Sequence, residues 1–208
     1  PASPEQIVEK ALEWQCGGIS FGVSEPAPMH EFVRDIFQAA GEANLDTHLA
    51  TGGMWNPEAL RKILPVTKAV TLGLKSLNHA FLQKHLGADK TTILNNLDML
   101  LALGIHVEIS WLVIPLISDK PEEAKELMGF LQRIGDYAPP LLLLSYVPNY
   151  TWIQTSRRAG IDDLQRFRSE FADYAGSIYV LHPESLEMNT RCPRCGRTLI
   201  RRGMARAV

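Results

Sequence analysis

Two cysteines near the end of the sequence have the most specific metal-binding spacing in the chain. Cys192 and Cys195 flank a Pro-Arg pair, and a Cys-x-x-Cys turn of this kind can present two thiolates to one metal ion. A structural zinc site needs about four ligands. The third cysteine, Cys16, is distant in sequence and is expected to be a small buried residue. The pair therefore predicts half of a metal site, with zinc as the candidate ion. An absent N-terminal segment or a second chain could complete it, or it could stay empty.

Glu25 is the first candidate for ligand binding. It belongs to the turn Ser24-Glu25-Pro26, which follows a short apolar run and precedes a helical pattern. A carboxylate at that place could hold the ammonium group of a ligand. A glutamate near a helix start also stabilises the helix by itself, and position alone does not separate these two interpretations.

Two more candidates follow predicted strands. The turn Thr51-Gly52-Gly53 lets the backbone approach a ligand closely, because neither glycine carries a side chain; an ordinary turn is the alternative. Lys75 interrupts an apolar strand. It could meet a ligand carboxylate, extend its ammonium group to solvent, or serve as the Schiff-base amine of a metal-independent aldolase. None of these patterns identifies a catalytic residue.

The elements that would position these residues alternate between strand and helix. Strands are expected at 19–23, 47–50, 69–74, 106–114, 141–147 and 177–181, and helices at 4–14, 29–43, 56–64, 80–86, 89–103, 121–134 and 162–175. Connections of helix length require parallel pairing of successive strands, and right-handed crossovers then curl the sheet around one core. Ligands gather at the carboxyl ends of such strands.

The predicted fold class is therefore α/β, as a partial parallel (β/α) barrel with a Cys-x-x-Cys tail. The sequence opens at Pro1 directly into a helix, so the first strand unit of the barrel is expected to be missing. Apolar periodicity gives way to Pro, Arg and Cys after about His182. The expected domains are the barrel at 1–182 and the tail at 183–208.

Composition narrows the class of partner. A net charge of −2 and hydrophobic residues at 46% describe an ordinary globular protein with no general attraction to nucleic acid or anionic membrane. No apolar run approaches the roughly 20 residues of a membrane helix, and no signal peptide is evident. Three cysteines suit a reducing cytoplasm. The six histidines share no ligand spacing, so none is assigned to a metal.

From residue 4 to residue 202 the chain resembles radical S-adenosylmethionine enzymes of the pyruvate formate-lyase-activating type, and within them the AmmeMemoRadiSam system subgroup. The matching segments are PEQIVEKALEWQCGGI, the strand ending in SEP, ATGGMWNPEAL, LGLKS, GIHVEISWLVIP and NTRCPRCGRTLIRR. In this family a four-iron, four-sulfur cluster and S-adenosylmethionine generate a radical that abstracts hydrogen from a substrate. The substrate would be a protein or a small molecule.

The resemblance also implies roles for particular positions. The turn of Ser24, Glu25 and Pro26 would take the methionine amino group, and the turn of Thr51, Gly52 and Gly53 would lie near the ribose and the methionyl part. Lys75 matches a family lysine at a strand end, and Ile114 and Pro115 flank the adenine region. Cys192 and Cys195 match the family's terminal Cys-Pro-x-Cys.

The sequence departs from the family pattern at its most characteristic motif. The Cys-x-x-x-Cys-x-x-Cys loop that holds the cluster is absent, and Gly52 and Gly73 replace the usual Asn and Asp. Without those thiolates iron is not held, and reductive cleavage of S-adenosylmethionine has no electron source. We expect the major C-terminal part of a radical S-adenosylmethionine oxidoreductase, inactive as the isolated chain. The alternative is a degenerate barrel that serves as a binding or protein-interaction module.

Overall fold

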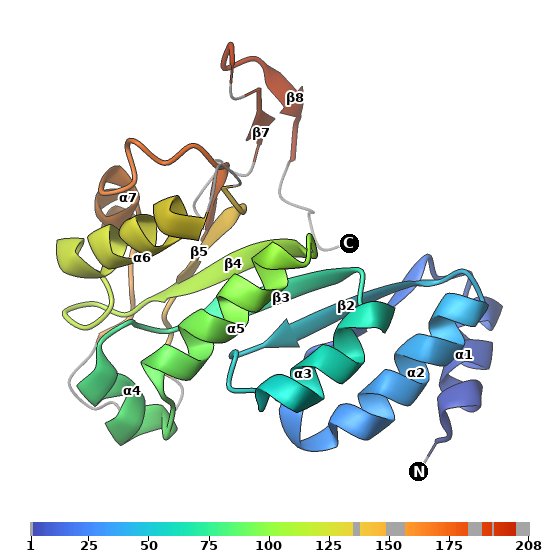
Figure 1. The fold of residues 1–208 in the computed structure, drawn as a ribbon. Coiled ribbons are helices and arrows are strands. Elements are labelled where there is room, and N and C mark those ends of the chain that lie inside the picture. The colour runs from blue at the N-terminus through green and yellow to red at the C-terminus, as the bar shows by residue number, and fades with distance from the viewer. Residues whose placement is uncertain (1, 135–137, 149–156, 183–188, 193, 203–208) are drawn as a thin grey trace. The chain divides into compact units, whose positions relative to one another are not determined.

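The computed structural model describes residues 2–134, 138–148, 157–182, 189–192 and 194–202 (Figure 1). The chain divides into two compact units. The first contains residues 1–73 and 88–108, and the second contains residues 74–87 and 109–208.

The first unit is built on parallel strands whose connections are helical. Its elements are α1 (Pro4–Glu13), β1 (Gly18–Phe21), η1 (Ala27–Met29), α2 (His30–Glu42), β2 (Asp46–Thr51), α3 (Pro57–Ile63), η2 (Leu64–Val66), nearly all of β3 (Ala69–Leu74), α5 (Lys90–Ala102) and the start of β4 (His106–Val113). β1 pairs in parallel with β2, and β2 pairs in parallel with β3. Helix α2 packs against β1 and β2 (Figure 1).

The second unit is also built on parallel strands with helical connections. It contains α4 (His79–Leu86), most of β4, α6 (Pro121–Ile134), β5 (Leu141–Ser145), α7 (Ile161–Ser169), β6 (Ile178–Leu181), β7 (Thr190–Arg191) and β8 (Thr198–Ile200). β4 pairs in parallel with β5, and β5 pairs in parallel with β6. Helix α7 packs against β5 and β6.

The strands form a six-stranded sheet in chain order, β1 to β6. The predicted α/β class and parallel order are confirmed. Alternate side chains along β2, β3 and β4 are buried: Thr47, Leu49 and Thr51 on β2, for example, but not His48. One face of the strand is therefore packed and the other is more open, which determines where polar side chains can stand.

Capping residues explain several helix starts. Ser3 and Gln6 form a capping box at α1: the Gln6 amide donates to Ser3 Oγ at 3.3 Å, and the Ser3 amide donates to Gln6 Oε1 at 2.9 Å. Asp89 caps α5 by accepting from the Thr92 amide at 2.7 Å. Ser and Asp are residue types preferred at helix N-caps, so the sequence explains where α1 and α5 begin.

Some boundaries and one element differ from expectation. The helix expected at 162–175 is α7 and ends at Ser169, after which the chain continues in tight turns rather than a helix. The strand expected at 141–147 ends at Ser145. In the tail, β7 and β8 form an antiparallel pair that the composition did not indicate. The predicted boundary after His182 adjoins residues 183–188, outside the described residues, and stays a prediction.

Within the described part of the chain, every helix is too short or too polar to cross a lipid bilayer.

Candidate functional site

The carboxylate of Glu25 is held by the turn that follows the neighbouring strand. Because Phe21 of β1 is paired with Leu49 of β2, the segments after both strands leave the same edge of the sheet. Thr51 Oγ1 donates to Glu25 Oε1 at 2.5 Å, and the Gly52 amide donates to Glu25 Oε2 at 2.7 Å. Glu25 therefore binds the Thr51 turn, and neither η1 nor α2 has a side-chain cap hydrogen bond at its start. The binding of a ligand ammonium group by Glu25 stays a prediction.

The hydroxyl of Thr51 is the centre of this arrangement. Besides donating to Glu25, it accepts from the Gly53 amide at 3.0 Å and from the Trp55 indole Nε1 at 2.8 Å. A hydroxyl has one donor and two acceptor sites, so all of them are used. Trp55, which the sequence did not single out, is only 2% exposed and fixes the turn from below.

Glycine is required at position 53 for two reasons. Its φ is +85°, a value that side-chain-bearing residues rarely adopt. A Cβ atom there would also lie 2.8 Å from Leu72 Cδ1 and 3.2 Å from Ile93 Cγ2. The packing of this turn therefore explains the glycine at position 53, and the approach of a ligand to its backbone stays a prediction.

This site has the chemistry of an ammonium acceptor. Glu25 is exposed, whereas Thr51 beneath it is buried. A carboxylate offers about four acceptor positions, and the two hydrogen bonds from the turn leave capacity on both oxygens. The donors fix the orientation of the carboxylate before any ligand arrives. Pro26, which is buried, directs the chain into η1 behind it, and Ser24 is exposed in the same turn.

The remaining predicted ligand-binding residues belong to the second unit. Lys75 is half-buried directly after β3. Ile114 and Pro115 are buried after β4. Their loop is closed by Ser118, whose Oγ accepts from the Ile114 amide at 2.8 Å and donates to the Leu112 carbonyl at 2.6 Å. Two hydrogen bonds within the second unit therefore hold the loop that contains Ile114 and Pro115.

A second polar cluster stands on the first three strands and was not predicted. Ser20 Oγ lies 2.7 Å from His48 Nδ1, and His48 Nε2 lies 2.8 Å from Thr71 Oγ1. Ser20 of β1 is the register partner of His48 on β2, and Thr71 on β3 lies two residues beyond Ala69, the register partner of His48. Burial lowers the pKa of His48; the Glu108 carboxylate opposes this shift and His106 adds to it. Residue spacing could not indicate the cluster, because its members are brought together only by strand pairing.

The cysteine pair lies at the turn of the β7–β8 hairpin. The Cys192 amide donates to the Arg197 carbonyl and the Gly196 amide donates to the Cys192 carbonyl, both at 2.8 Å. Hydrogen bonds from the backbone amides of Cys195 and Arg194 lower the pKa of the Cys192 thiol. Among the described residues no group of three or more His, Cys, Asp or Glu side chains could hold a metal ion. The described residues therefore do not fit an iron–sulfur cluster, and the described part of the tail brings together two cysteines where zinc needs about four ligands. Cys16, which the sequence predicted to be buried, is exposed, because it lies in the turn between α1 and β1.

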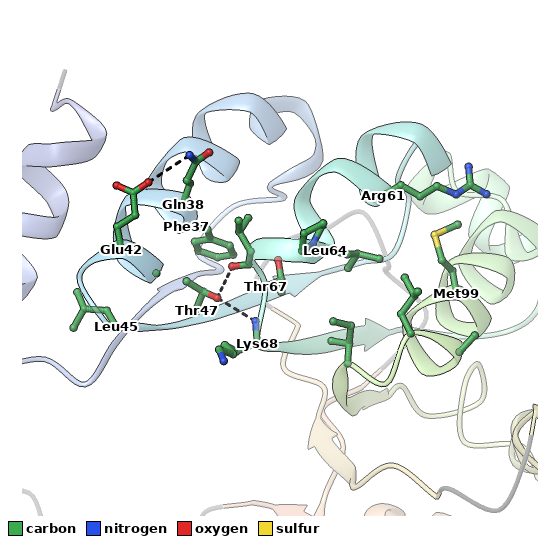
Figure 2. Close-up of a pocket in the computed structure, with 16 residues that line it drawn as sticks. Phe37, Gln38, Glu42, Leu45, Thr47, Arg61, Leu64, Thr67, Lys68 and Met99 are labelled. Carbon is green, nitrogen blue, oxygen red and sulfur yellow. Dashed lines mark hydrogen bonds between the residues drawn. The ribbon is translucent and has the colours of Figure 1, made fainter.

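A separate apolar pocket of about 1050 Å³ lies at the other end of the same strands (Figure 2). Thr47, at the start of β2, and Lys68, just before β3, are part of its lining. The Thr47 hydroxyl donates to the Val66 carbonyl at 2.7 Å and accepts from the Lys68 amide at 3.0 Å. This polar group is therefore engaged by the backbone, and the pocket is distinct from the Glu25 site.

Comparison with known sequences gives a consistent family. Residues 1–131 match the family model described as the Radical SAM superfamily. An uncharacterized protein of Methanocaldococcus jannaschii is 30% identical over 210 residues, covering 96% of this chain and 60% of that protein. The pyruvate formate-lyase 1-activating enzyme of Escherichia coli is 27% identical over 159 residues, covering 74% and 64%. The chain thus spans less than two thirds of the length of these relatives.

Solved structures share the fold. A domain of pyruvate-formate lyase-activating enzyme from Bacteroides vulgatus superposes with a TM-score of 0.69 at 17% identity, covering 80% of this chain and 99% of that one. Streptococcus suis SuiB bound to its precursor peptide SuiA gives a TM-score of 0.69 at 15% identity, covering 88% and 43%. At these identities the likeness concerns the fold alone.

Proposed function

This chain belongs to the radical SAM superfamily, and we propose that it is the major part of an oxidoreductase that binds S-adenosylmethionine and uses a four-iron, four-sulfur cluster. The observation that carries the proposal is the exposed Glu25 carboxylate, oriented by Thr51 and Gly52 at the carboxyl ends of two parallel strands. Family membership supports the cofactor class, and the oriented Glu25 carboxylate supports a role for this residue in binding the amino group.

The roles proposed for individual residues follow from their donors and acceptors. Glu25 would accept hydrogen bonds from the methionine ammonium, with Ser24 and Pro26 shaping the same turn. The turn of Thr51, Gly52 and Gly53 would border the ribose and methionyl part. In the second unit, Lys75 would face the ligand carboxylate, and Ile114 and Pro115 would border the adenine. When cofactor and cluster are both bound, they supply a radical that abstracts hydrogen from the substrate.

The cluster is proposed to be held by cysteines other than Cys16, Cys192 and Cys195. The described residues offer no set of three ligands for it, and a four-iron cluster needs several thiolates. The isolated 208-residue chain is accordingly proposed to be inactive. Its three cysteines are free thiols, which suits the reducing cytoplasm that we propose as its location.

For substrate and subgroup, we propose the AmmeMemoRadiSam type and a protein or peptide substrate. The support is the relationship to enzymes named for activating pyruvate formate-lyase and the shared fold with a protein solved with its precursor peptide. A zinc ion at Cys192 and Cys195 is a further proposal. It is supported by the hairpin that brings the two cysteines together, and it requires ligands from another segment or chain.

The alternative is a barrel that has given up radical chemistry and binds a partner protein. The lack of a three-ligand metal group among the described residues favours it. It predicts that the full-length protein retains a partner in a pull-down assay but binds no S-adenosylmethionine.

Replacement of Glu25 tests the proposed cofactor site. In the full-length protein loaded with its cluster, Glu25→Gln should weaken S-adenosylmethionine binding by about tenfold or more, because a charged hydrogen-bond acceptor is lost. Glu31→Gln is the matched control, since Glu31 is an exposed glutamate in the first turn of α2. Isothermal titration calorimetry measures both. Equal affinity of Glu25→Gln and wild type would remove Glu25 from the site, and absence of binding by the wild type would favour the partner-binding alternative.

A further inference from the structure

Asn96 joins helix α5 to the turn that orients Glu25. Its side chain is 1% exposed. The amide nitrogen Nδ2 donates to the Gly53 carbonyl at 2.9 Å and to the Trp55 carbonyl at 3.0 Å. Both hydrogens of the amide are therefore used, and both acceptors are backbone atoms of the segment that begins at Thr51.

These two hydrogen bonds restrain a stretch of irregular backbone. Gly53 has a positive φ, and neither the Gly53 nor the Trp55 residue lies in a helix or strand. A buried carbonyl without a donor is unfavourable, so Asn96 satisfies the two carbonyls while fixing their positions. On the other side of the same turn, Thr51 receives the Gly53 amide and the Trp55 indole. The turn is thus held by one side chain within it and by one from α5.

An asparagine at this place is unfavourable for packing alone. The buried residues beside it on α5 are apolar: Ile93, Leu97 and Leu100. The amide oxygen Oδ1 of Asn96 is buried and has no hydrogen-bond partner among the described residues. Burying such an unsatisfied polar atom is unfavourable for folding. A side chain kept at that cost is explained by its two donors, which an apolar residue of similar size could not provide.

We infer that Asn96 is a positioning residue for cofactor binding: it fixes the Thr51–Trp55 turn so that Thr51 Oγ1 and the Gly52 amide orient the Glu25 carboxylate. This inference rests on the proposed function. Asn96 does not touch the ligand, and its effect reaches the site through the two carbonyls and the two donors to Glu25.

The test compares two neighbouring asparagines of α5 in the full-length, cluster-loaded protein. Asn96→Asp preserves shape but places a carboxylate oxygen against the two carbonyl oxygens, so both hydrogen bonds are lost. Asn95→Asp introduces the same change at an exposed position of the same helix. Calorimetry with S-adenosylmethionine should show binding about tenfold weaker for Asn96→Asp and unchanged for Asn95→Asp.

Two further measurements separate positioning from simple stability. Amide hydrogen exchange in the unliganded protein should become faster at Gly52 and Gly53 in Asn96→Asp and stay unchanged in Asn95→Asp. If Asn96→Asp does not fold, Asn96→Ser, which keeps a single donor, should still weaken binding relative to wild type. A lower melting temperature with unchanged affinity and unchanged exchange would overturn the inference. No binding by the wild type would overturn the proposed function and, with it, the inference.

Discussion

His48 belongs to a polar cluster that strand pairing creates and that no sequence motif predicts. Its ring is bonded on both sides by hydroxyls, from Ser20 and Thr71. One ring nitrogen of a neutral imidazole donates and the other accepts, so a neutral ring suits the pair of partners. His48 alternates along β2 with the buried Thr47 and Leu49, so this hydrogen-bonded row lies on the opposite, more open face of the strand.

Protonation of His48 should destabilise the folded chain. Because burial lowers its pKa in the folded chain, the unfolded state binds the proton more readily. Protonation of His48 therefore lowers the free energy of unfolding. This destabilisation is complete below the pKa of the folded state, and it disappears as pH rises through the ordinary histidine value of about 6.5. Denaturant unfolding should be measured between about pH 5 and pH 8, the range in which histidine changes its charge. The free energy of unfolding of the wild type should rise with pH. His48→Gln should flatten this rise.

His79→Gln is the control for that experiment, because His79 is an exposed histidine that is not among the groups shifting the pKa of His48, so its removal should leave the rise in place. A pH profile that is identical in wild type and His48→Gln would show that the buried imidazole does not titrate differently in the two states.

At the scale of elements, Glu123 joins α6 to the loop that follows β3. Its carboxylate is 6% exposed and accepts from Ser76 Oγ at 2.7 Å and from the Leu77 amide. Burial raises the pKa of Glu123, and the hydrogen bonds from Leu77 and Ser76 oppose the shift. Lys75 directly precedes this loop, so the hydrogen bonds to Glu123 also restrain the backbone next to Lys75.

Removal of the Glu123 carboxylate should therefore destabilise the chain. Glu123→Ala leaves the buried Leu77 amide and Ser76 hydroxyl without their acceptor, so we expect a loss of about 1–3 kcal/mol in the free energy of unfolding. The adjacent Glu122 is exposed, and Glu122→Ala should change stability by less than about 0.5 kcal/mol. Urea denaturation measures both variants. Equal effects would mean that the loop is held by other contacts.

Local sequence signals predicted the elements better than the ways in which elements meet. Ser3 and Asp89 are local signals for the starts of α1 and α5, because a cap forms hydrogen bonds with residues only three positions away. The end of α7 and the β7–β8 hairpin were missed, since no cap or alternating apolar pattern marks them. In the site, Glu25 and Thr51 were both selected, but their hydrogen bond spans 26 positions. Asn96 and Glu123 act over 43 and 47 positions and leave no local spacing to detect.

At the scale of the whole molecule, the three cysteines are divided between the two compact units. Cys16 belongs to the first unit, whereas Cys192 and Cys195 belong to the second. Among the described residues no group of three His, Cys, Asp or Glu side chains could hold a metal ion. The thiolates of the cluster are therefore proposed to be separate from these three cysteines.

Anaerobic reconstitution with iron and sulfide tests that separation on the isolated 208-residue chain. We expect no four-iron cluster, judged by iron content and by the electron paramagnetic resonance signal of the reduced protein, because the described residues hold no three-ligand group. Cys192→Ser combined with Cys195→Ser identifies any metal that the hairpin alone retains, since only that fraction should disappear. If the isolated chain acquires about four irons with the signal of a reduced cluster, the cysteines present are sufficient. The proposal that the thiolates come from elsewhere is then wrong.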